Sequence, residues 1–394
     1  MREVVITAAT RTPTGKFQGD MGNLSAVELG AVVVNALLKQ SGIEPHMVNE
    51  VIMGQVLTSG CGQNPARQTA LRGGLPVSVC ATTVNLVCGS GLKAVQLATQ
   101  AIQSGVAEIV IAGGQESMSQ APFLLPDARS GIRLGQGKLV DSVMHDGLWD
   151  AFNDYSMGIT AENLASKFNI TRQAQDAFAV ESQRKAAIAQ EKGLFSDEIT
   201  PVSVKAGKGK VRIIDTDEQL RSDTTADSLA MLKPAFISEG TVTAGNASTL
   251  NDGAAAVLIM SREKALELNL PIMATIVSSA TAGVDPAIMG IGPVAASKRC
   301  LKDAGWMMDS LDLIEANEAF AVQALAVGQL LGWNNEKVNV NGGAIALGHA
   351  IGASGCRILV TLLYEMKRRD VSRGLATLCV GGGQGIALAL SRTK

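Results

Sequence analysis

The amino-acid sequence predicts an α/β protein built from two similar halves, each with a mixed, mostly parallel sheet covered by helices, and an inserted subdomain between them. Three observations lead to this prediction. Apolar, strand-like runs alternate with helical segments in both halves of the chain. One series of segments occurs twice in the same order. Residues 121–249 interrupt the alternation and differ from both halves in composition.

The duplication is visible as two pairs of matching segments. Near the start, an amphipathic helix, a glycine turn and a strand follow one another, with Gly42 in the turn and Gly54 at the end of the strand. Near the end the same three elements follow in the same order, with Gly305 and Asn317 at the same spacing. The second pair matches more closely: Gly105-Val-Ala-Glu-Ile-Val-Ile-Ala-Gly-Gly-Gln115 and Gly374-Leu-Ala-Thr-Leu-Cys-Val-Gly-Gly-Gly-Gln384. Glycine-rich segments can match by chance, but two pairs in one order favour duplication.

The N-terminal half shows its elements most clearly. An amphipathic helix is predicted to begin at Ala26, and a strand to cover residues 51–54. A second helix is predicted over residues 89–103, and it is apolar on nearly every face, so we expect it to be buried. Gly105, just past its end, suits the left-handed conformation that commonly ends a helix.

The chain is therefore divided into three parts. Residues 1–120 and 250–272 form the N-terminal half, and residues 273–394 form the C-terminal half. Residues 121–249 form an inserted loop domain that could cover a site between the halves.

The inserted segment has its own sequence features. It carries a polar helix predicted over residues 172–192 after the capping Thr171. Charges cluster at residues 205–210 and 215–218, and the basic cluster is more often a solvated loop than a phosphate site. Proline and glycine break its first part at Pro122, Pro126, Gly131, Gly135 and Gly137.

Composition excludes several classes of protein. The 394-residue chain is 46% hydrophobic and 18% charged, as in globular proteins with a large core. Its net charge of −2 argues against binding nucleic acid, and no apolar run is long enough to span a membrane. Six cysteines without a C-x-x-C pair and only three histidines predict no metal site and no disulfide framework. The first residues lack a signal-peptide pattern, so we expect a cytoplasmic protein.

The strongest chemical signal is Cys88, in Val84-Asn-Leu-Val-Cys88-Gly-Ser-Gly91. A strand-like run ends there and the buried helix begins, so free backbone N–H groups and the helix dipole are expected to favour a thiolate. The glycines let a substrate or another backbone approach closely. A lone cysteine is more often a buried apolar residue, and only partners elsewhere in the chain can decide between these readings.

Three other polar positions could be those partners. Asn317 and Cys379 each follow or end a predicted strand, and His349 lies in a glycine-rich loop before a helix. Strand ends and helix starts share one face in duplicated α/β folds, so these side chains could converge on Cys88. A histidine can take the proton of a nucleophilic thiol, and a second cysteine can exchange protons with a thiol leaving group. Singly, His349 and Cys379 would be read as packed core residues; jointly the four favour thiol-based acyl transfer.

At this point the sequence resembles the thiolase family across essentially its whole length. The motifs that carry the resemblance are spread along the chain: Arg11-Thr-Pro13, the segment around Cys88, Thr243-Ala-Gly-Asn-Ala-Ser248, Asn251-Asp-Gly253, Asn317-Glu-Ala-Phe320, Gly348-His349, Ile351-Gly-Ala-Ser-Gly355 and Cys379-Val-Gly-Gly-Gly-Gln-Gly385. The resemblance is strongest to the short-chain biosynthetic type, an acyltransferase class that forms acetoacetyl-CoA. It implies α-β-α-β-α layers.

The resemblance implies a role for each reactive residue. Cys88 attacks an acyl-CoA thioester and becomes acylated, while His349 stabilises the thiolate. Cys379 protonates the departing CoA and then removes an α-proton from a second acetyl-CoA. Asn317, through a water, and His349 polarise the thioester oxygen of that second molecule, and the N–H groups of Cys88 and Gly381 hold the oxyanion on the acylated cysteine.

The resemblance also implies how substrates and partners bind. Coenzyme A thioesters are substrates rather than cofactors, so no cofactor is expected. Arg221 is expected at the nucleotide end of CoA and Met289 at the limit of acyl length. A homotetramer, tethered through about residues 123–141, is implied. The full set of expected CoA-binding residues is Leu148, Ser156, Met157, Arg221, Ala244, Ser248, Met289, Ala319 and Phe320.

Two positions depart from the family pattern. Ser156 stands where similar enzymes usually have a histidine, which bears on CoA affinity or acyl preference. Ala350 replaces the usual proline after His349 and removes a fixed φ from that loop. Three other functions stay open: a broader 3-ketoacyl-CoA thiolase of fatty-acid degradation, a silent acyl-CoA-binding protein, and a ketoacyl synthase, against which Cys379 argues.

Overall fold

The structure is a computed structural model that describes residues 2–207 and 210–393. One large sheet dominates it. Its strands are β1 (Val4–Arg11), β2 (Gly15–Lys16), β3 (Glu50–Gly54), β4 (Cys80–Val84), β5 (Ile109–Ser117), β12 (Asn251–Ser261), β13 (Ala274–Gly283), β14 (Leu313–Ala316), β15 (Arg373–Val380) and β16 (Gln384–Ser391). The order is β14-β15-β16-β13-β1-β12-β5-β3-β4, and β2 pairs with β12.

This order confirms the duplication. From the centre outwards, β1, β12, β5 and β3 follow one another as β13, β16, β15 and β14 do on the other side. The halves meet where β1 pairs antiparallel with β13 through Val4–Ile6 and Ala274–Ile276. Among the described strands, pairing between the halves covers only this short stretch, so most of the packing between them comes from helices.

The sheet is mixed, as expected, but the prediction that its pairings are mostly parallel is wrong. Among the described strands, β3 is parallel to β4 and β5, and β14 to β15, whereas β1, β12, β13 and β16 pair antiparallel with all their neighbours. The sequence alternation predicted helical crossovers throughout. Instead a tight glycine turn joins β15 directly to β16, and the chain returns from its long insertion as β12, running opposite to β5.

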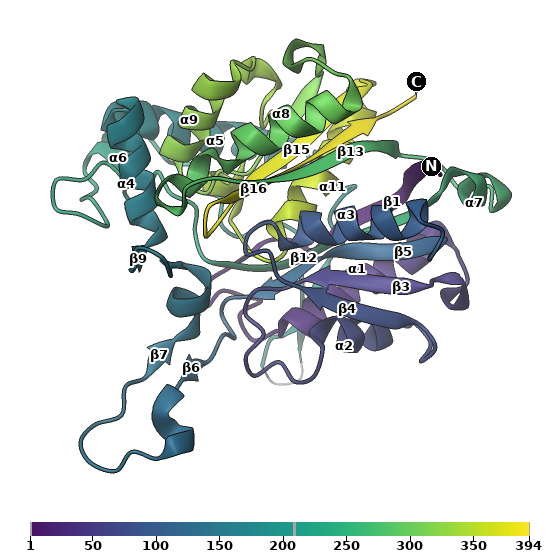
Figure 1. Cartoon of the computed structure of the whole chain (residues 1–394), viewed down its shortest axis with the longest axis horizontal. Coiled ribbons are helices and arrows are strands. Elements are labelled where there is room, and N and C mark those ends of the chain that lie inside the picture. Colours follow the sequence, from purple (N-terminus) through teal and green to yellow (C-terminus); the bar gives the residue numbers. More distant parts are fainter. Residues whose placement is uncertain (1, 208–209, 394) are drawn as a thin grey trace.

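The helices complete the predicted layers (Figure 1). Helices α3 and α11 lie between the two parts of the sheet and contact strands of both, so they form the middle layer. Helices α1 and α2 cover the outer face of the N-terminal part, and α8 covers that of the C-terminal part. Their bounds are α1 (Ala26–Ser41), α2 (Pro65–Arg72), α3 (Ser90–Gln103), α7 (Arg262–Glu267), α8 (Gly292–Ala304), α9 (Ala321–Leu331), α10 (Ala344–Leu347) and α11 (Ser354–Arg369).

Local sequence explains where the important helices begin and end. Ser25 caps α1 in a capping box with Glu28, and Gly42 ends it in the left-handed conformation. Gly105, after α3, also has a positive φ of 79°, as predicted. Both α3 and α11 start at small residues packed against each other: a Cβ on Gly91 would lie 2.9 Å from the Cys356 nitrogen. This close approach brings the starts of the two middle helices together.

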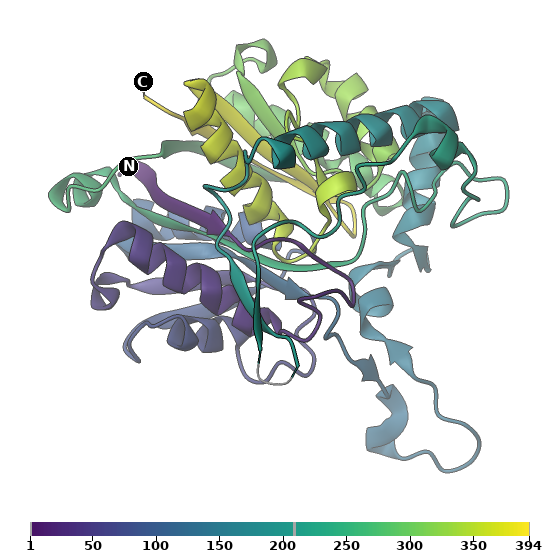
Figure 2. The ribbon, with the colours of Figure 1, turned by 180° about the vertical axis from the view of Figure 1, so that it is seen from behind.

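The inserted segment has two parts (Figures 1 and 2). Residues 123–141 form an arm that projects from the body and exposes apolar side chains, among them Phe123, Leu134 and Leu139. In the rest, α4 and α5 pack against the C-terminal half, and the β10–β11 hairpin packs against the N-terminal half. The elements of the inserted segment are β6 (Phe123–Leu124), β7 (Val140–Asp141), β8 (Trp149–Asp150), β9 (Tyr155–Ser156), α4 (Met157–Phe168), α5 (Arg172–Glu191), β10 (Val202–Lys205), β11 (Val211–Ile214) and α6 (Ala226–Ala230).

Two expectations from the sequence concern the basic cluster and membrane-spanning helices. Lys208 and Gly209, within the basic cluster of residues 205–210, lie outside the described residues. Across residues 2–207 and 210–393, no helix combines the length and apolar character needed to cross a membrane.

Candidate active site

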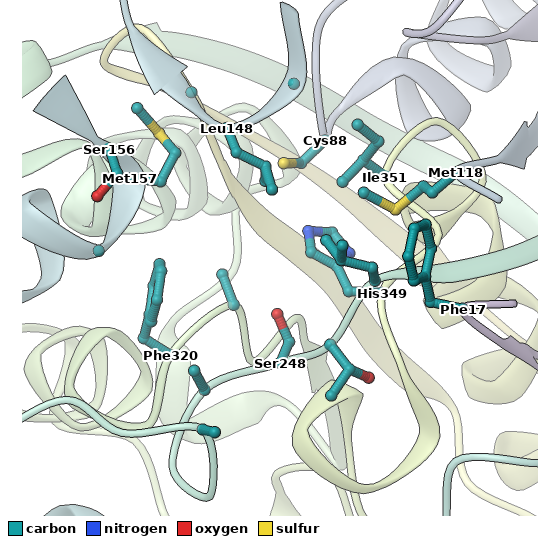
Figure 3. Close-up of a pocket in the computed structure, with 18 of the residues that line it drawn as sticks. Phe17, Cys88, Met118, Leu148, Ser156, Met157, Ser248, Phe320, His349 and Ile351 are labelled. Atoms are coloured by element: carbon teal, nitrogen blue, oxygen red, sulfur yellow. The ribbon is translucent and has the colours of Figure 1, made fainter. Parts of the chain in front are cut away.

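A cavity of about 490 Å³ lies between the two halves and the inserted segment. Figure 3 shows Cys88 and His349 on its wall, with Leu148 and Met157 from the inserted segment opposite Phe320 and Ser248. The structure brings nearly all predicted site residues to this cavity. Those that line it are Cys88, Leu148, Ser156, Met157, Arg221, Ala244, Ser248, Met289, Ala319, Phe320, His349 and Gly381.

Cys88 sits in a tightly held turn just before α3. The residue before it, Val87, has a φ of 44°, which is strained for a β-branched residue. The Asn85 side chain accepts a hydrogen bond from the Val87 N–H at 2.8 Å. The Ser90 hydroxyl accepts from the Leu86 N–H at 2.8 Å and donates to the Val87 carbonyl at 2.6 Å. These bonds stabilise the strained turn that presents the thiol to the cavity.

The protonation state of Cys88 differs from the sequence-based expectation. Burial raises the pKa of its thiol to about 11, although the backbone N–H groups of Gly381 and of Cys88 itself act in the opposite direction. These N–H groups act in the direction expected from the sequence, but burial outweighs them and the pKa is raised. The helix dipole stabilises a thiolate by less free energy than it costs to place an anion among apolar side chains. Cys88 is therefore a neutral thiol at rest.

His349 is held in one orientation by its neighbours. Its Nδ1 lies 2.6 Å from the Ser354 hydroxyl, which itself donates to the Ala350 carbonyl at 2.8 Å. Because the Ser354 hydroxyl hydrogen is already used in that bond, the hydroxyl oxygen accepts a hydrogen bond from Nδ1–H of His349. Nε2 therefore carries no hydrogen and can accept a proton. Asn251 accepts from the His349 backbone N–H at 2.8 Å. Burial, with a smaller contribution from the Arg357 charge, lowers the pKa of His349 to about 4, so the ring is neutral.

Asn317 lies behind the cavity wall, directly after β14. Its side-chain nitrogen is 3.5 Å from both ring nitrogens of His349, too far for a strong hydrogen bond. Its Oδ1 is buried and has no partner among the described residues. Asn339 fixes the strand end by bonding both the N–H and the carbonyl of Ala316. Asn317 thus presents an unsatisfied amide beside the imidazole.

Cys379 also lies behind the wall, near the end of β15. It is buried in an apolar cluster with Met157, Met289 and Phe320. Burial raises the pKa of its thiol above the usual range, and a negative charge on Cys88 would raise it further. The β15–β16 turn that follows places the Gly381 N–H within hydrogen-bonding reach of Cys88.

The sequence reading missed several residues of the site. Glu116, at the end of β5, is buried and accepts hydrogen bonds from the N–H groups of Val56, Leu57 and Gly352, and so ties together three segments around the cavity. Glu116 directly follows the repeated Gly-Gly-Gln segment, and this position in the sequence could have indicated it as a site residue. The cavity lining that no sequence pattern indicated consists of Lys16, Phe17, Met118, Met144, Gly147, Gly158, Gln219, Phe236, Thr249 and Leu250.

In the part of the chain that the structure describes, no three His, Cys, Asp or Glu side chains are grouped as metal ligands would be.

A partly exposed thiol, a buried thiol, an imidazole and free backbone N–H groups at the junction of two duplicated halves define a class of protein, the thiol-dependent acyltransferases. The family models agree with this class. The thiolase N-terminal domain matches residues 4–263 and the thiolase C-terminal domain matches residues 270–392. The chain belongs to the thiolase family.

Known proteins of this family resemble the chain over its full length. An acetyl-CoA acetyltransferase of Pseudomonas aeruginosa is 64% identical and one of Cupriavidus necator is 62% identical, each with 100% of both chains covered. A solved acetyl-CoA acetyltransferase from Bacillus anthracis is 47% identical and superposes with a TM-score of 0.97 over 99% of both chains. The thiolase-like fold is therefore confirmed.

Proposed function

We propose that this thiolase is an acetyl-CoA C-acetyltransferase, which reversibly condenses two acetyl-CoA molecules to acetoacetyl-CoA and CoA. The observation that carries the proposal is the meeting of Cys88, His349 and Gly381 on one cavity, with Cys379 and Asn317 immediately behind its wall. The names of relatives that are 64% and 62% identical support it.

The first half-reaction acylates Cys88. Both Cys88 and His349 are neutral at rest, so the thiol proton passes to His349 Nε2 as the sulfur attacks the thioester carbonyl. The oxyanion that forms is stabilised by the N–H groups of Gly381 and Cys88. The carbon–sulfur bond to CoA breaks, Cys379 protonates the departing thiolate, and acetyl-Cys88 remains.

The second half-reaction forms the carbon–carbon bond. The Cys379 thiolate removes an α-proton from a second acetyl-CoA, whose enolate oxygen is stabilised by His349 and by Asn317 through a water. The carbanion attacks the acetyl carbonyl, and the Cys88 sulfur leaves as a thiolate that regains a proton. Two cysteines are needed because a thiol is both the leaving group and the acyl carrier.

The cavity suits a pantetheine thioester. Its lining is largely apolar, with methionines at positions 118, 144, 157 and 289, and it is open at the exposed Arg221, where we place the nucleotide end of CoA. The Ser156 hydroxyl lines the cavity and caps no N–H of α4. It therefore remains available to a bound thioester. CoA thioesters act as substrates, and the proposed reaction needs no cofactor.

The arm of residues 123–141 supports a homotetramer. It exposes large apolar side chains far from the body, and Leu134 is 98% exposed. Apolar surface of this kind is usually covered by a partner. Light scattering of the protein with residues 125–139 replaced by a short glycine-serine loop should give dimers instead of tetramers. We place the reaction in the cytoplasm, where acetyl-CoA is available and thiols stay reduced.

Thiolysis of 3-ketoacyl-CoAs of increasing chain length, with CoA as the second substrate, tests the function. We expect turnover confined to acetoacetyl-CoA and its next homologue. Equal turnover of long chains would assign the protein to the degradative thiolases instead. No turnover at any length, together with no acetyl transfer from acetyl-CoA to Cys88, would identify a protein that binds acyl-CoA without catalysis.

A further inference from the structure

A second cavity, of about 480 Å³, lies outside the site described above. It is formed by α5 and α9 with the segment of residues 333–339, and it is called here the α5–α9 cavity; Figure 1 shows these two helices together at the edge of the C-terminal half. Small residues on the facing helix surfaces, such as Ala177 and Gly328, leave the space open. The volume falls in the range of small-molecule sites, and the walls are mainly apolar, with Phe178 and Leu325 among them.

The α5–α9 cavity contains a hydrogen-bond donor without a partner. Trp333 is only 9% exposed, and its indole N–H makes no hydrogen bond within the described part of the chain. Its Nε1 lies beside Gly328: a Cβ on that glycine would be 2.9 Å away. This N–H is not enclosed by protein, so it is accessible from the cavity and can donate to a ligand with an acceptor atom.

One cation on the wall of the α5–α9 cavity, Lys185, is available to an anion. Lys185 has no carboxylate within ion-pair distance among the described residues; its ammonium donates to the Val338 carbonyl at 3.3 Å and keeps further N–H groups available. The two acidic residues on the wall are already engaged. Glu181 forms two 2.7 Å hydrogen bonds with Arg184. Glu318 accepts from Ser182, from Asn339 and from the Ile345 N–H.

The floor of the α5–α9 cavity is the back of the catalytic loop. Ala316 and Glu318, which both line it, are the neighbours of Asn317 in the chain. Asn339 joins them by hydrogen bonds of 2.7 Å to the Ala316 carbonyl and 2.9 Å to Glu318. A molecule in this cavity would press on the same short segment that holds the Asn317 amide beside His349.

We propose that the α5–α9 cavity binds a small carboxylate with an apolar tail, and that its occupation changes turnover by shifting Asn317. The tail packs between α5 and α9, and the carboxylate accepts from Trp333 and Lys185. The binding does not depend on the proposed function, whereas the effect on turnover does.

The test uses 4-phenylbutyrate as the probe and its uncharged amide as the control. The chain has three tryptophans, so a Trp149→Phe, Trp306→Phe variant leaves Trp333 as the single fluorophore. With saturating CoA present to fill the active-site cavity, we expect saturable quenching by the carboxylate and at least about 10-fold weaker binding of the amide. Calorimetry on the unaltered protein gives the same constant and covers the case in which the double variant does not fold.

Variants locate the site. Ala177→Phe fills the cavity and should abolish binding, and Lys185→Met should weaken it about 10-fold. Gln173→Phe adds the same side chain to the exposed face of α5 outside the cavity and should leave binding unchanged. Absence of saturable binding, its loss when CoA is added, or its persistence in Ala177→Phe would overturn the site. Bound probe should lower kcat for acetoacetyl-CoA thiolysis without changing KM, and an unchanged kcat would overturn the link to Asn317.

Discussion

Two nearly identical glycine segments occupy corresponding positions in the two halves, and they adopt different conformations. In the N-terminal half, Gly113 and Gly114 continue β5 straight on to Ser117, paired with β3 and β12. In the C-terminal half, the matching Gly382 and Gly383 have φ values of 79° and 83° and turn the chain directly into β16. The same residues thus make a strand in one place and a turn in the other.

The difference shows that the connection decides the conformation. After β15 the next strand, β16, follows at once, so the glycines must reverse the chain. After β5 the chain leaves for the inserted segment and returns only at β12, so no reversal is needed. The straight copy uses its glycines for close packing instead: a Cβ on Gly114 would lie 2.1 Å from the Gly352 carbonyl oxygen. One copy positions Gly381, the oxyanion donor of the proposed mechanism, and the other supports the loop that follows His349.

The largest expected effect comes from removing the reactive group of the N-terminal half. Cys88→Ala should lower acetoacetyl-CoA thiolysis by about 10⁴-fold or more, because no other thiol can carry the acyl group. Steady-state thiolysis measures this, and mass spectrometry of the protein after incubation with acetyl-CoA should show no acetyl group. Cys80→Ala, which removes an exposed thiol of β4, is the control. Acetylation of the Cys88→Ala protein elsewhere in the cavity would show that the halves share the role.

The packing role of the straight copy is tested by Gly114→Ala. The new methyl group would overlap the Gly352 carbonyl and the Ala353 backbone, so we expect a loss of about 3 kcal/mol in the free energy of unfolding. Urea denaturation measures it. Gly283→Ala, at the end of β13, is the control because its Cβ would have no contact closer than 4.0 Å. Equal stability of the two variants would disprove the packing role.

A third effect concerns the reactive residue of the C-terminal half. Because the pKa of folded His349 is about 4 and that of an unfolded histidine about 6.5, only the unfolded chain takes up this proton between those values. Stability is therefore lost as pH falls through 6.5 towards 4. From pH 7 to pH 5 the loss due to His349 is about 2 kcal/mol. Urea denaturation of His349→Asn should show a correspondingly smaller pH dependence, and an unchanged one would contradict the burial argument.

The smallest effect is expected in the turn itself. Gly382→Ala places a methyl group no closer than 3.7 Å to any neighbour, so only the left-handed backbone is penalised, at about 1 kcal/mol. The adjacent Gly381 N–H should tilt and lower kcat about 10-fold with little change in KM. A loss of stability larger than that of Gly114→Ala would reverse the assignment of packing to one copy and turn geometry to the other.

Much of the fold and site could be predicted because the signals are local or repeated. The duplicated segments predicted two halves, and the places where strands end and helices start predicted that Cys88, His349 and Asn317 would converge. The antiparallel pairing was not predicted, since alternation of strand and helix does not show where a long insertion or a three-glycine turn replaces a crossover.

Two kinds of site property depended on the folded structure. Cavity residues such as Met118, Met144 and Phe236 come from segments with no repeat and no polar signature, so nothing in the sequence singled them out. The charge of Cys88 depended on a balance between the helix start and burial. Position in the chain predicts the helix start, but only the assembled core shows how much solvent is excluded.

The neutral thiol of Cys88 has a consequence for chemical reactivity. With a pKa of about 11, only roughly one molecule in 10⁴ carries a thiolate at pH 7, so general alkylating agents and peroxides should attack the resting protein slowly. In the proposed mechanism, acyl thioesters overcome this barrier because they bring a carbonyl to the N–H groups of Gly381 and Cys88 while His349 takes the proton. A selective covalent inhibitor of this protein should therefore imitate a thioester bound in the active-site cavity. A compound that relies on its electrophilicity alone would react with other thiols first.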